Sequence, residues 1–345
     1  MQKVRIAVLG LNQGYKFAKD TLSMSEDVEL VAVAGNNELA KERAKELHVP
    51  LYTDYKDLLQ ECDLDGVIIA LPNDLHREAV EIAAQKGIHV LVEKPIASTI
   101  EDGEAIIQAC KKNNVKLLVG HHRRFSSKVK KLKEIISSGK LGKIIGINML
   151  WVLAKDKAYF SEKWRLAKSG GPLLINGIHE IDTLRFVTGL RIKRVFASMN
   201  NRLRNNPVED SAAILLETDE GVAINYFLSD GVPSPWSYDL NVKENPKFHH
   251  HEANCYKIFG SEGSLSFPDF HLYSYDEKKY GWEHPLIVEK IPVEDNDPMT
   301  EELKHFIDVL RGKAEPVVTG EDALETLKVI KAIQLSGDKG EAVLI

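Results

Sequence analysis

Two groups of residues in this chain have types and spacings that suit catalysis. In the first group, Glu93 and Lys94 stand beside Pro95 at the end of the apolar run 88–92. In an open α/β sheet the carboxyl ends of the strands border the ligand crevice, so we expect this charged pair to face a bound molecule. Lys94 is therefore the first candidate for chemistry, and the alternative is a rigid ion pair beside a turn.

The second group is His179 and Asp182, which are three residues apart. On a helix this spacing places both side chains on one face. Histidine suits the transfer of the proton that a carbinol loses as hydride leaves, because its pKa lies near neutral pH. The alternative is a core histidine that Asp182 satisfies, and these two residues alone favour that alternative.

Alternating strands and helices must position Lys94. The sequence predicts strands at 4–9, 29–34, 66–71, 88–92 and 116–119, with helices between them that include 38–47, 76–86 and 98–112. Strands that alternate with helices at this spacing predict a parallel sheet with right-handed crossovers. The layout is typical of nucleotide-binding domains, although a fold alone does not establish a function.

The turn after the first predicted strand runs from Gly10 to Tyr15. A dinucleotide fingerprint has glycine at positions 10, 12 and 15, and here only Gly10 is in place, with Gly14 displaced by one. The turn opens a helix, so backbone N–H groups around Asn12 and Gln13 could hold a pyrophosphate. A plain tight turn is an equally weighted alternative.

The second predicted strand ends at Gly35 and Asn36, where dinucleotide sites usually carry an acidic residue for the ribose. No carboxylate is present to repel a 2′-phosphate, and Asn36 and Asn37 can donate to a hydroxyl or a phosphate. NADP is therefore a candidate cofactor, with Lys41 or Arg43 as more distant cations.

Length and composition limit the function classes. The 345 residues exceed the size at which one core keeps growing, and the 43% hydrophobic and 28% charged content is that of a folded globular protein, so we expect two domains. A net charge of −6 argues against nucleic-acid or anionic-membrane partners. Three scattered cysteines, no signal-peptide pattern and no apolar run near the ~20 residues of a membrane helix predict a cytoplasmic protein.

The second half is predicted to be a sheet domain. Strand patterns occur at 143–154, 195–199, 212–217, 222–227, 256–260 and 265–267, and helical patterns at 178–187, 300–310 and 321–335. The helices are expected to cover one face of the sheet. The tract His249-His250-His251 does not predict a metal site, because adjacent side chains on an extended segment point to opposite faces.

Taken together, the motifs resemble the family of glucose–fructose oxidoreductase, inositol dehydrogenase and rhizopine-catabolism proteins, called Gfo/Idh/MocA. The resemblance covers nearly the whole chain and rests on Leu71-Pro72-Asn73-Asp74-Leu75-His76, Glu93-Lys94-Pro95, Arg123-Arg124-Phe125, Lys163-Trp164-Arg165 and the segment 170–182. It implies an N-terminal Rossmann domain for NAD(H) or NADP(H), residues 1–121. It also implies a C-terminal α+β domain, residues 122–345, built on a large open, mostly antiparallel sheet.

The resemblance implies hydride transfer between the nicotinamide and a carbinol or carbonyl carbon of a sugar, sugar acid or cyclitol bound between the domains. Lys94 would stabilise charge on the reacting oxygen, His179 would transfer the proton, and Asp182 would orient His179 or bind a hydroxyl. A homodimer or homotetramer through the outer face of the C-terminal sheet is expected. The stretch 34–36 is similar to the Ser-Gly-Asn of NADP-using members, which slightly favours NADP over NAD.

The resemblance also implies a set of binding residues. The expected cofactor contacts are Gly10, Asn12, Gln13, Gly35, Asn36, Leu71, Pro72, Asn73, His76, Glu93, Lys94, Trp164 and Arg165. The expected substrate contacts are Lys94, Arg124, Arg165, Asn176 and His179. For Arg124 and Arg165, an ion pair at the surface or between the domains is a comparably weighted alternative.

Two positions depart from the family pattern. Tyr15 replaces the third fingerprint glycine, and Ile175 stands where many inositol and sugar dehydrogenases have aspartate, four residues before the histidine. Asn176 instead resembles a branch with an Ile-Asn-x-Ile-His pattern, so inositol is not transferred as the substrate. Two alternatives within the same fold are a non-catalytic nucleotide-sensing scaffold protein and a redox-assisted, NAD-dependent glycoside hydrolase.

Overall fold

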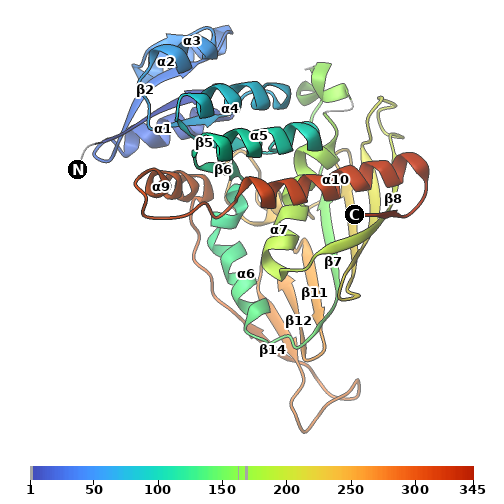
Figure 1. The fold of residues 1–345 in the computed structure, drawn as a ribbon. Coiled ribbons are helices and arrows are strands. Elements are labelled where there is room, and N and C mark those ends of the chain that lie inside the picture. Colours follow the sequence, from blue (N-terminus) through green and yellow to red (C-terminus); the bar gives the residue numbers. More distant parts are fainter. Residues whose placement is uncertain (1–2, 162, 168–169) are drawn as a thin grey trace. The chain divides into compact units, whose positions relative to one another are not determined.

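The computed structural model describes residues 3–161, 163–167 and 170–345, and of Lys163 and Trp164 it describes the backbone alone. The chain divides into two compact units (Figure 1). The first unit comprises Met1–Phe125 and Asp297–Leu327, and the second comprises Ser126–Asn296 and Lys328–Ile345. The break after Phe125 lies close to the expected boundary at 121/122, whereas residues 297–327, expected in the second domain, pack in the first unit.

Within its described part, the first unit contains a six-stranded sheet in the order β3-β2-β1-β4-β5-β6, and every pairing is parallel. The strands are β1 (Val4–Leu9), β2 (Val28–Ala34), β3 (Leu51–Tyr52), β4 (Gly66–Ile69), β5 (His89–Glu93) and β6 (Leu117–Gly120). The central strands β1 and β4 are almost completely buried, which explains their continuous apolar sequences. This is the predicted Rossmann arrangement.

Seven helices of the described residues belong wholly or partly to this unit. They are α1 (Gly14–Ser23), α2 (Glu38–Leu47), α3 (Tyr55–Glu61), α4 (His76–Gln85), α5 (Ile100–Lys112), α9 (Pro298–Leu310) and the start of α10 (Gly320–Lys339). Helix α9 approaches β4 at Gly66, where a Cβ would lie 2.8 Å from Leu310 Cδ1. The Val119 N–H of β6 also donates to the Val318 carbonyl at 3.1 Å. These contacts place residues 297–327 in the first unit.

The second unit contains a nine-stranded sheet among the described residues, in the order β14-β13-β12-β11-β7-β10-β9-β8-β15. Neighbouring strands are antiparallel except for β7 and β10, which run parallel. The strands are β7 (Ile144–Val152), β8 (Ile192–Asn200), β9 (Ser211–Thr218), β10 (Ala223–Ser229), β11 (Tyr256–Gly260), β12 (Gly263–Phe267), β13 (His271–Ser274), β14 (Ile287–Lys290) and β15 (Val343–Leu344). The prediction of a large, mostly antiparallel sheet is confirmed.

The helices of the second unit are α6 (Ser127–Ser137), α7 (Ile178–Thr188), α8 (Tyr238–Asn241) and the part of α10 from Lys328 onward. Burial alternates along β9 and β10, so one face of the sheet is interior and the other is open. The interior face receives α10, whose Ser336 hydroxyl accepts from the Ala197 N–H at 2.9 Å. Among the described helices, none is long and apolar enough to cross a membrane.

Candidate active site

The strand order of the first sheet changes direction at β1, from which the chain proceeds to β2 and β3 on one side and to β4, β5 and β6 on the other. Ligands of such sheets bind outside the carboxyl ends of the strands at this switch point. The carboxyl ends of β1, β2, β4 and β5 lead to Gly10, Gly35, Leu71 and Lys94. The topology therefore gathers the residues predicted in this unit at one sheet edge.

Gly10 leaves β1 in a conformation that only glycine adopts without strain. Its φ is +88°, and a Cβ there would lie 2.3 Å from the carbonyl oxygen of Ala70. The turn can therefore lie close to the end of β4 and lead directly into α1. Asn12 and Gln13 are exposed, and the Gln13 side chain does not cap the helix. This N-terminus fits the pyrophosphate of a dinucleotide.

Gly14 takes over the packing role of the missing third fingerprint glycine. It begins α1, and a Cβ there would lie 2.7 Å from Val8 Cγ1 and 3.2 Å from the Cβ of Ala70. Close approach of helix and strand therefore depends on glycine at this position. Tyr15 is accommodated outside the turn, where its hydroxyl bonds Glu46 and its ring lies under the Arg43 guanidinium, 4.5 Å from the centroid.

Arg43 also fixes the turn itself. Its guanidinium donates to the carbonyl oxygens of Leu11 and Asn12, the latter at 3.2 Å. The cation that the sequence suggested as distant help for a 2′-phosphate thus joins α2 to the glycine turn. Lys41, the other cation considered, pairs with Glu38 at 2.7 Å on the exposed face of α2.

The two asparagines that follow β2, Asn36 and Asn37, have different surroundings. Asn37 caps α2, because its side chain accepts a hydrogen bond from the Ala40 N–H at 2.8 Å. Asn36 is exposed, and Gly35 before it allows close packing, since a Cβ there would lie 2.6 Å from that of Ala40. Of the two asparagines, Asn36 is therefore the one whose side chain is exposed, and its contact with an adenosine ribose or its phosphate stays a prediction.

His76 lies in the interior and joins two loops of this edge. Nδ1 lies 3.0 Å from the Pro95 carbonyl oxygen, and Nε2 lies 3.0 Å from that of Leu71. Burial lowers the pKa of His76, which the two carbonyl groups oppose. Leu71 and Asn73 remain partly accessible and Pro72 is exposed. Pro72 and its neighbours thus stay available to a cofactor, while His76 holds their loop against the loop of Lys94.

Glu93 is buried at the last position of β5, and the half-buried Lys94 follows it. Glu93 Oε2 accepts from the Lys94 N–H at 3.2 Å, and burial raises the pKa of the Glu93 carboxyl while Lys94 opposes the shift. A Cβ at Gly120 of β6 would lie 3.3 Å from the Glu93 carboxyl carbon. The carboxyl group is therefore enclosed within the unit and helps to fix the backbone of Lys94.

Arg124 is buried and forms an ion pair with Asp322 in the first turn of α10. Both residues belong to the first unit. The pair corresponds to the structural alternative considered for this arginine, except that it lies inside the unit. Contact with substrate remains a prediction for Arg124.

In the second unit, His179 and Asp182 lie in the first turns of α7 and both are buried. One turn of π-helix, Leu173–Gly177, precedes α7 and carries Asn176. Such π turns recur at functional sites in helices. The predicted helix thus places Asn176, His179 and Asp182 at spacings of three residues, on one side of a continuous helical segment.

Arg165 lies beside the segment that precedes this helix. Its guanidinium donates to the Tyr159 carbonyl at 2.6 Å and lies 4.0 Å from the Tyr159 ring centroid. The Trp164 side chain, predicted to form a pocket wall and contact the cofactor, lies outside the described residues. Near Gly171, the half-buried Glu209 accepts from the Leu173 N–H at 3.0 Å, and desolvation raises the pKa of its carboxyl.

Sequence reasoning missed Lys155 and Asp230, although it named their neighbour Asn176. Lys155 Nζ donates to Asn176 Oδ1 at 2.8 Å and lies 3.3 Å from Asp230 Oδ2. Burial lowers the pKa of Lys155 to about 8, although Asp230 opposes the shift. One signal in the sequence could have found Lys155, because it follows the end of β7 by three residues. Lys94 was selected by the same criterion, a lysine close after the carboxyl end of a strand.

Lys155 also borders a cavity of about 820 Å³ within the second unit, a volume typical of small-molecule sites. The cavity is lined by Leu153, Ala154, Lys155, Asp156, Tyr159, Pro233, Ser234, Pro235, Leu240, Lys247, Phe248 and His251. Aromatic, aliphatic and charged groups therefore share this space. Among the described residues, no group of three or more histidine, cysteine or acidic side chains could hold a metal ion.

Family models match both parts of the chain. Residues 4–121 match the model described as "Oxidoreductase family, NAD-binding Rossmann fold", and residues 129–266 match the "GFO/IDH/MocA C-terminal domain". The chain belongs to the GFO/IDH/MocA family. The resemblance inferred from the motifs is thus confirmed.

Individual relatives are similar over nearly their full lengths. The scyllo-inositol 2-dehydrogenase (NAD(+)) of Bacillus subtilis is 27% identical over 95% of this chain and 92% of its own. The myo-inositol 2-dehydrogenase of Thermotoga maritima is 25% identical over 99% of this chain and 98% of its own. The solved structure of scyllo-inositol dehydrogenase from Lactobacillus casei, with bound NAD(H) and scyllo-inositol, has a TM-score of 0.79 at 23% identity and covers 99% of both chains.

Proposed function

We propose that this family member is an NAD(P)-dependent oxidoreductase that transfers hydride between nicotinamide and a carbinol or carbonyl carbon of a sugar, sugar acid or cyclitol. The observation that carries the proposal is the carboxyl edge of the first sheet, where the sterically required Gly10 and the half-buried Lys94 follow strands β1 and β5. A glycine turn that opens a helix suits a pyrophosphate. A lysine at the carboxyl end of another strand of the same sheet suits a reacting oxygen. The dehydrogenase names of the relatives support the same reaction class.

The chemistry divides between the cofactor and the protein side chains. The nicotinamide ring supplies or accepts hydride when it is bound. The Lys94 ammonium donates a hydrogen bond to the reacting oxygen and stabilises the negative charge that develops there. His179 takes the proton from the carbinol in oxidation and returns it in reduction. Asp182, one helical turn later, orients the His179 imidazole or binds a substrate hydroxyl.

The remaining predicted residues are assigned by where they lie. Asn12, Gln13 and Asn36 are exposed at the sheet edge and are proposed to contact the cofactor directly. Glu93 and His76 are interior, so we assign them to holding the loops of Lys94 and Leu71. Further predicted contacts that keep their proposed roles are Gly35, Pro72, Asn73, Arg124, Trp164, Arg165 and Asn176.

We propose a preference for NADP(H) over NAD(H). The end of β2 offers the exposed Asn36, and the first acidic residue of α2, Glu38, is paired with Lys41. A neutral amide does not repel a 2′-phosphate, whereas a carboxylate at this position would. The NAD(+) in the name of the Bacillus subtilis relative makes the choice of cofactor the first property to measure.

We also propose that the open face of the second sheet joins copies of the chain into a dimer or tetramer. Large apolar side chains are exposed on that face, including Phe196, Leu215 and Phe227, of which Leu215 is 46% exposed. Phe196, Leu215 and Phe227 line a hollow of about 450 Å³. A contiguous apolar surface of this kind is typical of a subunit interface.

We also propose that the protein is located in the cytoplasm. Cys62, Cys110 and Cys255 are not joined in disulfides. Burial raises the pKa of the Cys110 thiol to about 12, so it stays protonated and unreactive. Free thiols suit a reducing compartment.

The testing experiment is a fluorescence titration of cofactor-free protein with NADH and NADPH, followed by a screen of polyols and sugars with the oxidised form that corresponds to the tighter binder. Saturable binding of one reduced cofactor, with turnover of a polyhydroxylated substrate that Lys94→Ala abolishes, supports the proposal. Absence of binding by both cofactors would overturn it.

A further inference from the structure

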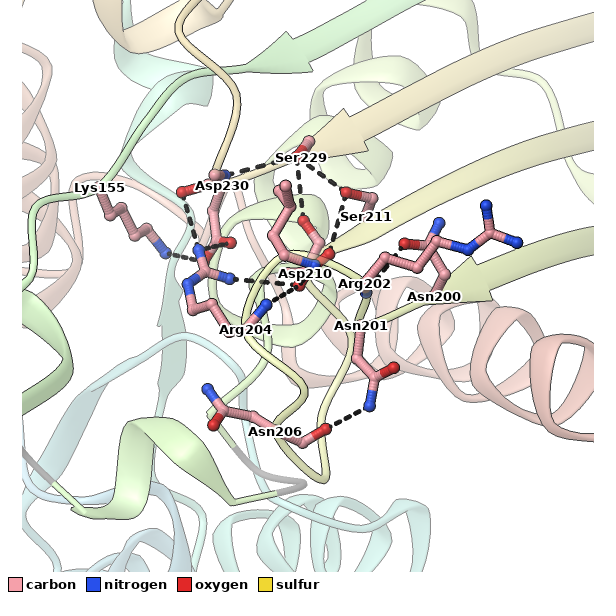
Figure 2. A network of polar contacts seen from close by, with 12 residues as sticks. Lys155, Asn200, Asn201, Arg202, Arg204, Asn206, Asp210, Ser211, Ser229 and Asp230 are labelled. Carbon is pink, nitrogen blue, oxygen red and sulfur yellow. Dashed lines mark hydrogen bonds and ion pairs between the residues drawn. The ribbon is translucent and has the colours of Figure 1, made fainter.

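Lys155 is held by the parallel pairing of β7 and β10. Beyond the paired strands, Ala154 and Gly231 form an isolated bridge, and the Lys155 N–H donates to the Asp230 carbonyl at 2.9 Å. The Lys155 ammonium then lies 3.3 Å from Asp230 Oδ2 (Figure 2). The backbone and the side chain of Asp230 thus fix the same lysine.

The carboxylate that holds Lys155 is itself anchored. Arg204 forms an ion pair with Asp230 and donates to its carbonyl at 2.9 Å (Figure 2). Asp210 accepts from the Arg204 N–H at 3.0 Å and from the Ser211 hydroxyl at 3.2 Å, and Ser211 meets Ser229 at 2.9 Å. Both carboxylates are 1% exposed, so this network is a rigid, balanced group of buried charges.

Within the part of the chain that the structure describes, the Lys155 ammonium faces two oxygen acceptors, Asp230 Oδ2 at 3.3 Å and Asn176 Oδ1 at 2.8 Å. It also lies over the rings of Tyr159 and Trp151, with centroids at 4.4 and 5.5 Å. An ammonium group can donate but cannot accept. Lys155 therefore decides the orientation of the Asn176 amide, because only the oxygen can face it.

The consequence for Asn176 is a fixed polarity. With Oδ1 engaged, the amide presents its NH₂ group, a donor that cannot accept, away from Lys155. The nearby positive charge polarises the amide and strengthens that donor. In the turn Leu173–Gly177, which leads to His179, Asn176 carries the one polar side chain. The polar group that this turn offers is therefore a donor fixed by Lys155.

We propose that Lys155 is a positioning residue that fixes Asn176 as a hydrogen-bond donor, and that this donor selects a sugar acid by binding its carboxylate. The inference rests on the proposed function and narrows its substrate class. A carboxylate only accepts hydrogen bonds and makes charge-assisted ones, whereas a hydroxyl that accepts from this NH₂ group must place its own proton on another acceptor. The walls of the cavity beside Lys155 also carry Lys247 and Asp156, so a positive and a negative side chain both border this space.

The test compares D-glucuronate with D-glucose, which differ by the carboxylate, in binding to enzyme saturated with the reduced cofactor. We expect wild-type protein to bind glucuronate about tenfold more tightly or better, the usual gain from a bond to a charged group. Asn176→Asp keeps the side-chain shape, retains an ion partner for Lys155 and replaces the donor by an acceptor. It should remove the preference or reverse it.

Lys155→Met frees the amide and should lower the glucuronate preference severalfold, while Lys157→Met, an exposed lysine on the same segment, should not. Thermal unfolding of each variant reports whether it folds, and Asn176→Asp remains decisive if Lys155→Met does not. Burial lowers the pKa of Lys155 most, the charge of Arg204 lowers it further, and the carboxylates of Asp230 and Asp239 oppose the shift. A neutral amine can accept from the amide, so wild-type glucuronate affinity should fall as the pH rises through about 8, the pKa of Lys155, and Lys155→Met should lack this dependence.

Equal affinity for the two sugars, no glucuronate binding, or an unchanged preference in Asn176→Asp would overturn the inference and leave the proposed function standing. Cofactor binding is measured first, so its absence in the wild type would be recognised separately. That result would overturn the proposed function and this inference together.

Discussion

The two units hold their candidate functional groups by different means. In the first unit, backbone geometry does most of the positioning: Gly10 and Gly14 bring the turn against β1 and β4, and Lys94 is placed by the end of β5. In the second unit, buried side chains do it: Asp230 and Arg204 hold Lys155, which holds Asn176. Substitutions that enlarge a glycine should disturb the first arrangement. Substitutions that remove a charged side chain should disturb the second.

The contrast follows from the ligands that each unit is proposed to serve. A dinucleotide phosphate is bound well by backbone N–H groups, which need space more than they need particular side chains. A substrate must be distinguished from similar molecules, and that requires side chains of fixed polarity. Steric substitutions should therefore damage cofactor binding, while charge substitutions should change substrate choice.

The largest effect is expected at His179, the residue of the second unit that is proposed to transfer the proton. His179→Ala should lower kcat by about 10²–10⁴ because the carbinol proton loses its acceptor, with little change in NADH or NADPH affinity. Stopped-flow and steady-state rates measure this, with His284→Ala as the exposed-histidine control. A loss smaller than about threefold would exclude His179 from proton transfer.

A steric change should act on the first unit alone. Gly10→Ala forces a Cβ to within 2.3 Å of the Ala70 carbonyl oxygen at a φ of +88°. We expect about 1–3 kcal/mol of lost stability or an equivalent 5- to 150-fold loss of cofactor affinity. Denaturant unfolding and cofactor titration measure the two, and Gly87→Ala is the control because its φ is +75° with no atom within 4 Å of the new Cβ. Equal cofactor losses in both variants would contradict a role for close approach at Gly10.

A substitution on the open face of the second sheet tests the proposed subunit interface and leaves the proposed cofactor and substrate contacts unchanged. Phe227→Glu places a charge on a side chain that is 40% exposed and lines the hollow on this face. The dissociation constant of the oligomer should rise about thirtyfold, as for loss of an interface hot spot. Light scattering over a concentration series measures it, with Leu22→Glu on α1 as control. If the wild type is monomeric, or if only the control dissociates, this face is not the interface.

The smallest expected effect concerns cofactor choice. Asn36→Asp should shift the ratio of NADPH to NADH affinity by about tenfold toward NADH, because a carboxylate accepts from ribose hydroxyls and repels a 2′-phosphate. Asn36→Ser keeps a small neutral side chain and should shift the ratio much less. Parallel titrations measure both ratios, and an identical shift in the two variants would mean that charge at residue 36 is not what selects the cofactor.

The contrast also explains what the sequence could predict. The Rossmann sheet, the strand that ends at Glu93 and the helix of His179 follow from local patterns of apolar residues and turns. Gly14 as the packing glycine was not predicted, because the fingerprint is read by fixed spacing whereas the structure starts α1 one residue earlier. The exposed Asn36 and the capping Asn37 were likewise not distinguished.

The pairing of Lys155 with Asn176 and Asp230 could not be predicted, because it depends on β7 and β10 lying side by side in parallel. No local pattern specifies which distant strands pair. For a related reason, the sequence did not predict that α9 belongs to the first unit. The amphipathic sequence of α9 shows that the helix packs on a hydrophobic core, but it does not show on which of the two cores.

The return of residues 297–327 to the first unit has a consequence for how this protein is made. On the ribosome, the first 125 residues emerge long before α9 covers Gly66 and before Asp322 reaches the buried Arg124. The nucleotide-binding unit can therefore be completed only when nearly the whole chain has been synthesised. A nascent chain at this stage exposes apolar surface that later segments will cover, and it is a natural client for chaperones.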